Sequence, residues 1–209
     1  KQYKELYEIV KKEKTLNNFQ TKEEKQFLIW HEAIAIFEVN RSTKTALTLL
    51  NHALKLTLTN SDFLSEREIH IMQTMAIFHG ENKEYEKSIK ILKRCLTNFN
   101  KLDLPRDKEI KLKIIFNLAK CLDFIYQHEE AIKYIDRGIK LAINLNTLYL
   151  LGELFYLKGQ CLLKIKQHNV EDVVYNWKKA LFIFELTEKE YYIKMVQDEL
   201  IEIQNKKHS

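Results

Sequence analysis

The chain has 209 residues, of which 45% are apolar and 30% charged, and its net charge is +5. This length suits one or two ordinary domains, or an array of about five helical hairpins. One proline and four glycines supply too few turn residues for a strand-rich fold, so long helices joined by short turns are favoured. The apolar runs are too short to span a membrane, and no signal peptide is visible.

Hydrophobic periodicity predicts helices along the whole chain. We expect them at residues 2–15, 22–39, 43–57, 66–80, 84–101, 107–126, 129–145, 147–165, 170–186 and 188–205. Three capping boxes, each a Ser or Thr followed three residues later by Glu, mark helix starts: Thr21/Glu24, Ser65/Glu68 and Thr187/Glu190. The segment 102–106 is predicted to be the longest connector, because Pro105 cannot lie inside a helix.

Pairs of small residues seven apart recur along the chain with a nearly constant period. The first members are separated by 42, 43 and 42 residues, and the pairs are Ala46/Ala53, Ser88/Cys95, Ala131/Gly138 and Val173/Ala180. A period of this length is typical of stacked helical hairpins. We therefore predict an all-α fold, a tetratricopeptide-like helical-hairpin repeat superhelix of about five degenerate repeats, forming a single domain over residues 1–209.

The hairpins resemble tetratricopeptide repeats, in which small residues at the eighth and twentieth positions let two helices approach closely. The pairs Ala76/Ser88 and Ala119/Ala131 have this twelve-residue spacing. Ala33 and Ala46 are thirteen apart, and Gly159 and Val173 are fourteen apart, which predicts two extra residues in the turn around 167–169. The period also exceeds the usual 34 residues, so the helices are expected to be longer than in the common repeat.

In this geometry the first helix of each hairpin lines the concave surface. The side chains expected to point inward are Trp30, Gln73, Thr74, Ile77, Lys113, Phe116, Asn117, Lys120, Glu153, Tyr156, Leu157 and Gln160. Amide groups both donate and accept hydrogen bonds, so they suit the backbone of an extended peptide. Asn117 is a poor helix former in mid-helix, which favours a functional role. Phe116 and Tyr156 fit the core equally well, and Trp30 and Trp177 are expected to be packing residues.

The sequence shows no pattern typical of a catalytic site. It has neither a glycine-rich phosphate loop nor a G-x-S-x-G motif, and Ala35 stands where a zinc helix beginning at His31-Glu32 would need its second histidine. Cys95, Cys121 and Cys161 are expected to be reduced core residues rather than disulfide or metal partners. The basic residues Lys206-Lys207-His208 alone do not indicate nucleic-acid binding. We expect neither enzymatic activity nor a cofactor nor a bound metal.

Several stretches, in order over nearly the full length, carry a family resemblance. They are YKELY at 3–7, QFLIW at 26–30, FNLAK at 116–120, LGELFY at 151–156, KGQCL at 158–162 and WKKA at 177–180. In these stretches the chain resembles the regulatory domain of PlcR-type transcription activators, within the Rap–Npr–PlcR–PrgX group of peptide pheromone receptors of Gram-positive bacteria. Small insertions separate it from that pattern near residues 15–21 and near the second repeat.

The resemblance implies a cytoplasmic protein with about five degenerate repeats in a right-handed superhelix. It also implies a secreted, processed and re-imported signalling peptide bound in the concave groove, and a homodimer. A helix-turn-helix domain that binds a palindromic promoter site is expected upstream of Lys1. The chain would then control transcription in quorum sensing and touch DNA only through that domain.

Peptide-contacting positions of the family can be carried over one by one. Asparagines fall on Asn117 and Gln73, a glutamine on Glu153, a tyrosine on Tyr192 and a lysine on Lys1. A buried unpaired carboxylate at position 153 would be costly. We therefore expect a basic or hydrogen-bond donor group opposite Glu153, from the peptide or from a neighbouring lysine such as Lys113.

Two other functions remain open at this point. A Rap-like inhibitor would bind a response regulator or phosphorelay protein and release it when a peptide binds, and it would carry an upstream three-helix bundle. A scaffold that grips C-terminal carboxylates would use Lys113, Asn117 and Lys120, but a single repeat supplies all three.

Overall fold

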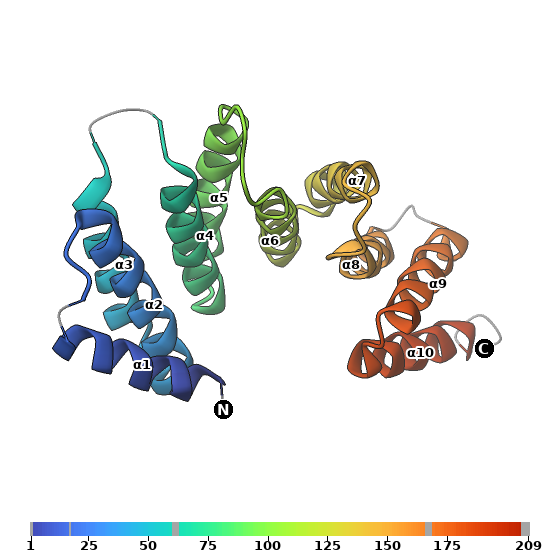
Figure 1. The fold of residues 1–209 in the computed structure, drawn as a ribbon. Helices are drawn as coiled ribbons and strands as arrows, with labels where there is room; N and C mark the ends of the chain where they lie inside the picture. The colour runs from blue at the N-terminus through green and yellow to red at the C-terminus, as the bar shows by residue number, and fades with distance from the viewer. Residues whose placement is uncertain (1, 17, 60–62, 166–168, 206–209) are drawn as a thin grey trace. The chain divides into compact units, whose positions relative to one another are not determined.

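The structure is a computed structural model that describes residues 2–16, 18–59, 63–165 and 169–205, and every regular element within those ranges is an α-helix (Figure 1). The helices are α1 (Gln2–Leu16), α2 (Lys22–Asn40), α3 (Thr43–Thr57), α4 (Glu66–Glu81), α5 (Tyr85–Phe99), α6 (Ile110–Phe124), α7 (His128–Asn144), α8 (Leu151–Lys164), α9 (Val170–Leu186) and α10 (Glu190–Asn205). Lys1, the basic residues 206–208 and most of the turn expected around 167–169 lie outside the described residues.

Two of the three capping boxes form as the sequence predicts. The Thr21 hydroxyl accepts a hydrogen bond from the Glu24 amide at 3.2 Å, and the Glu24 carboxylate accepts one from the Thr21 amide at 2.9 Å. Ser65 and Glu68 make the same exchange at 3.3 and 2.8 Å. These contacts satisfy amides that would otherwise lack partners at the first turns of α2 and α4.

The third capping box, Thr187 with Glu190, was a wrong prediction. Thr187 is the C-cap of α9, and its hydroxyl donates to the Ile183 carbonyl at 2.8 Å. Glu188 follows with φ = 53°, and α10 begins only at Glu190. The hydroxyl is therefore used by the preceding helix, which keeps it from capping the next one.

Consecutive helices pair as antiparallel hairpins. The pairs are α2/α3, α4/α5, α6/α7 and α8/α9, while α1 packs on α2 and α10 on α9. All eight small residues that predicted this pairing are buried, and so are Ala33, Ala76, Ala119 and Gly159 on the partner helices. The Ser88 hydroxyl also donates to the Ala76 carbonyl at 2.7 Å, which joins α5 directly to α4.

The helices group into two units, Lys1–Arg106 with α1–α5 and Asp107–Ser209 with α6–α10. In the second unit, Trp177 and Phe184 of α9 form the centre of a core that Val196, Leu200 and Ile203 of α10 complete. In the part of the chain that the structure describes, no helix is both long enough and apolar enough to cross a bilayer.

Candidate functional site

The predicted site residues of α6 form one stripe along that helix. Lys113, Phe116, Asn117 and Lys120 are spaced at i, i+3, i+4 and i+7, and each is half-buried. The residues between them, including Leu118 and Ala119, are fully buried. The stripe is thus a partly solvated face whose polar groups are accessible to a ligand.

Two members of this stripe are held in place by neighbours on the same unit. The Asn117 amide nitrogen donates to the Lys113 carbonyl one turn earlier, at 2.8 Å. The Lys113 ammonium lies 3.8 Å from a carboxylate oxygen of Asp107 and 5.4 Å from the ring centre of Tyr149. The Asn117 side chain is therefore oriented by its own helix, and its position does not depend on a ligand.

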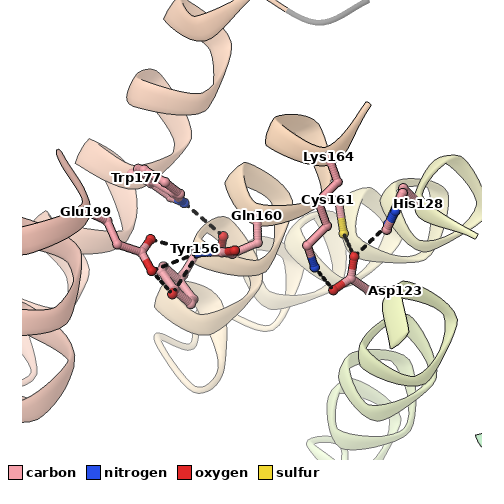
Figure 2. Close-up of polar contacts among 8 residues, drawn as sticks. All are labelled: Asp123, His128, Tyr156, Gln160, Cys161, Lys164, Trp177 and Glu199. Atoms are coloured by element: carbon pink, nitrogen blue, oxygen red, sulfur yellow. Dashed lines mark hydrogen bonds and ion pairs between the residues drawn. The ribbon is translucent and has the colours of Figure 1, made fainter. Parts of the chain in front are cut away.

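On α8, Tyr156 and Gln160 share one acceptor, the carboxylate of Glu199 on α10 (Figure 2). The Tyr156 hydroxyl donates to Glu199 at 2.7 Å, and the Gln160 amide donates to Glu199 at 2.7 Å and to the Tyr156 hydroxyl at 2.9 Å. Burial, followed by the hydrogen bond to Glu199, raises the pKa of Tyr156 above its ordinary value of 10.0. Both side chains are half-buried and fixed in one network.

Trp177 of α9 packs against the Tyr156 end of this network. Its indole nitrogen donates to the Tyr156 carbonyl at 3.3 Å, and its ring stacks on the Tyr156 ring with centroids 6.3 Å apart. Trp177 is 2% exposed, which agrees with the packing role expected for it. The network is therefore held in place by a rigid core residue.

Glu153 lies one turn before Tyr156 on α8 and is buried, with 9% of its surface exposed. Its Oε1 atom accepts a hydrogen bond from the Lys189 ammonium at 2.5 Å. Its Oε2 atom is buried and has no hydrogen-bond partner among the described residues. The carboxylate is thus half satisfied, which is an expensive state for a buried charge.

The lysine that neutralises Glu153 is not the one suggested by the sequence. Lys113 pairs with Asp107, and Lys189, just before α10, takes its place at Glu153. The sequence analysis also missed Glu199. Lys189 lies in the connection before α10 and Glu199 lies on α10, and no local sequence pattern relates either residue to α8.

In the first unit, Gln73 of α4 is buried and 5% exposed. The neighbouring Thr74 accepts a hydrogen bond from the Trp30 indole nitrogen at 3.0 Å, so Trp30 is a packing residue there. Trp30 also lines a cavity of about 720 Å³, whose other walls include Phe27, Phe63, Arg67 and His70. Phe27, one turn before Trp30, was not among the side chains expected to point inward.

The two remaining predicted residues contribute differently. The Tyr192 ring stacks on Phe184, with centroids 4.8 Å apart, and is a partly buried side chain packed against the core of the second unit. Lys1 lies outside the described residues. The structure therefore brings Tyr156 and Gln160 together on α8 and places the four predicted residues of α6 along one face of that helix, and α6 and α8 are themselves in contact.

A family model described as the RNPP family C-terminal domain matches residues 1–202. The crystal structure of Bacillus thuringiensis PlcR in complex with the peptide PapR7 and DNA superposes with a TM-score of 0.80 at 26% identity, covering 93% of this chain and 68% of that one. The apo form of the same protein gives a TM-score of 0.82 at 26% identity, covering 95% and 72%.

A Rap protein complexed with competence and sporulation factor is similar in fold. Its TM-score is 0.69 at 15% identity, and the match covers 95% of this chain and 57% of that one. At this identity the likeness shows a shared fold. No curated protein gives a significant match to the sequence.

Proposed function

Because this chain belongs to the RNPP family and carries its C-terminal domain, we propose that it is a regulatory domain that binds a short signalling peptide and controls a DNA-binding transcription activator. The solved PlcR complex, which contains both a peptide and DNA, supports this proposal at 26% identity. The peptide would lie along the stripe of α6 and the adjoining face of α8. The chain would act by binding, without catalysis.

The observation that carries the proposal is the buried oxygen of Glu153. An acceptor without a partner costs about 1–3 kcal/mol, so a peptide whose binding turns the Glu153 side chain toward it and donates to this oxygen would gain up to that amount. Lys189 donates to one oxygen of the carboxylate and leaves the other without a hydrogen-bond donor. A lysine, an arginine or the N-terminal amine of the peptide supplies such a donor.

The rest of the face suits an extended peptide. Asn117 and Gln160 bear amide groups held at fixed positions by hydrogen bonds. Groups fixed before binding lose little conformational entropy when a ligand arrives. Phe116 and Tyr156 each add the surface of a half-buried aromatic ring.

Regulation would follow from differential binding. A peptide that contacts α6 and α8 together favours the arrangement of hairpins in which both faces meet it, and so shifts the population toward that arrangement. In a homodimer with DNA-binding domains upstream of Lys1, such a shift would alter how those two domains meet DNA. These partners, and a cytoplasmic site of action, are part of the proposal.

A library of random heptapeptides tests this function. The immobilised wild-type protein is expected to retain a restricted set of peptides in which a basic residue recurs at one position. Glu153→Gln is expected to bind the same peptides roughly ten-fold more weakly, as expected when a hydrogen bond to a charged acceptor is lost. Lys140→Ala, an exposed change on α7, serves as the matched control and should bind like the wild type. Unchanged or tighter binding by Glu153→Gln would count against the proposed role of the carboxylate.

The alternative is a Rap-like inhibitor of a response regulator or phosphorelay protein, for which the Rap fold supplies the precedent. The sequence upstream of Lys1 separates the two. A helix-turn-helix there supports the transcription regulator, and a three-helix bundle supports the inhibitor.

A further inference from the structure

Three side chains with different metal-binding atoms meet where α6, α7 and α8 come together (Figure 2). Asp123 lies in the last turn of α6, His128 is the first residue of α7 and Cys161 lies near the end of α8. One ligand atom from each lies within 4.8 Å of the other two. In the part of the chain that the structure describes, no other three His, Cys, Asp or Glu side chains bring their ligand atoms this close together.

The three groups are close enough to bind one ion after small rotations. Oδ1 of Asp123 lies 2.7 Å from Nδ1 of His128 and 3.4 Å from the Cys161 sulfur. Asp123 is 7% exposed and Cys161 is fully buried. Each ligand comes from a different helix of a packed hairpin stack, so their relative positions are fixed by the fold before any ion arrives.

We propose that Asp123, His128 and Cys161 form a binding site for a divalent transition-metal ion, with Zn²⁺ as the ion whose ligand preference fits best. Oxygen, nitrogen and sulfur ligands in one tetrahedral site suit Zn²⁺, whereas Mg²⁺ and Ca²⁺ require oxygen ligands. The three protein ligands leave a fourth position for a water molecule or another small ligand. On α8, Cys161 lies on a different side of the helix from Tyr156 and Gln160 of the proposed peptide-binding face (Figure 2).

The charges of the ligands balance those of the ion. A carboxylate and a thiolate contribute two negative charges, which one divalent cation cancels, and the partly exposed Lys164 ammonium beside them keeps its own charge. Metal binding thus exchanges the thiol proton, and any proton on the coordinating imidazole nitrogen, for the cation.

Lys164 acts as the outer partner of this site. Its ammonium lies 2.5 Å from Oδ2 of Asp123, the oxygen that faces away from His128. A hydrogen bond of this kind orients a ligating carboxylate while leaving the other oxygen for the metal. The first unit has a comparable pair, His79 with Glu84 at 2.7 Å, but no sulfur ligand joins it within the described residues.

Titration of the purified, reduced protein with Co²⁺ tests the proposal directly. The wild type is expected to bind one equivalent and to develop a thiolate-to-cobalt charge-transfer band with the d–d bands of a tetrahedral site, and Zn²⁺ should displace the Co²⁺. Cys161→Ala should lose the charge-transfer band. Cys95→Ala, which removes another buried cysteine, is the matched control and should keep it.

Two further variants separate metal binding from a purely structural role. Lys164→Met keeps all three ligands and is expected to weaken Zn²⁺ binding by about ten-fold, as outer-partner changes do. In wild type, but not in Asp123→Asn, added Zn²⁺ should raise the unfolding temperature. A wild-type protein that shows no charge-transfer band with Co²⁺ overturns the proposal, whatever the variants do. A band that persists in Cys161→Ala overturns it equally.

Discussion

The indole ring of Trp177 on α9 occupies the space beside Gly159 on α8 that any larger side chain would need. A Cβ atom at position 159 would lie 2.3 Å from both Cδ1 and Nε1 of the indole. The same ring stacks on Tyr156 and donates to its carbonyl. Gly159 therefore lets Trp177 approach closely enough to hold the Tyr156 segment of the candidate site.

Gly159→Ala is expected to destabilise the protein by about 1–3 kcal/mol. Alanine gains about 1 kcal/mol of helix propensity, but the overlap with a fully buried ring costs more than this. Urea unfolding measures the change. Gly138→Ala is the matched control: its added Cβ would meet side-chain atoms of Leu154 at 3.0–3.1 Å and of Ile115 at 3.1 Å, a smaller overlap, and the variant should lose less stability. Equal losses in both variants would contradict the explanation.

Lys189→Met should destabilise the protein more than Glu153→Gln does. Removing the lysine leaves a buried carboxylate without its counter-charge, whereas removing the carboxylate's charge leaves a lysine that is one-third exposed and can be hydrated. Because of that exposure we expect a loss of about 1–2 kcal/mol for Lys189→Met, less than a fully buried pair would show.

The double variant Glu153→Gln/Lys189→Met completes a thermodynamic cycle for this pair. We expect it to be about as stable as Glu153→Gln alone, since neither charge is then left buried and unpaired. Strictly additive losses in urea unfolding would mean that the two side chains do not interact.

Tyr156→Phe should change how stability depends on pH in the alkaline range. The folded-state pKa of Tyr156 lies above 10.0, so above that pH the unfolded chain loses the tyrosine proton before the folded protein does. The hydroxyl therefore stabilises the fold fully below pH 10.0, and this contribution falls as the pH rises toward the folded-state pKa. The stability difference between wild type and Tyr156→Phe should shrink over that window.

Thermal unfolding at stepwise higher pH measures this difference. Tyr149→Phe is a second case with the same sign, because burial and then Glu109 raise the pKa of Tyr149 to about 12. A difference between wild type and Tyr156→Phe that stays constant well above pH 10.0 would show that the hydroxyl is not the group responsible.

Helix-cap variants separate the two correct capping predictions from the wrong one. Thr21→Ala and Ser65→Ala should each cost about 1 kcal/mol, because each removes the acceptor for an amide in the first turn of its helix. Thr187→Ala should cost less, since its hydroxyl donates to a C-terminal carbonyl of α9 rather than capping α10. If urea unfolding shows that Thr187→Ala loses as much stability as the other two variants, the predicted capping box at Thr187 and Glu190 would be supported after all.

The hairpin architecture could be predicted from the sequence because the signals that define it are local or periodic. Close helix contacts require small side chains, so the pairs such as Ala131/Gly138 mark the contacts directly, and all of them are buried. Thr21 and Ser65 mark helix starts because both partners of each capping box lie within one turn. Thr187 failed because the same short spacing also suits a residue that ends a helix.

The site could be predicted only in part, because much of it depends on contacts between distant residues. The stripe of α6 follows from its helical period, but Glu199 meets Tyr156 from 43 positions away. Lys189 reaches Glu153 across 36 positions. The tight turns within two hairpins could not be predicted either. Lys83 between α4 and α5 and Tyr126 between α6 and α7 adopt φ = 61° and 63°, a conformation for which glycine would be the expected sequence signal.

Native mass spectrometry of the protein purified from its native host tests the central claim most directly. We predict one short peptide bound per chain, released on denaturation, and strongly depleted when Asn117→Ala and Glu153→Gln are combined but retained in Lys140→Ala. Absence of any peptide from the wild type, or equal retention by the combined variant and the control, would contradict a peptide-binding face on α6 and α8.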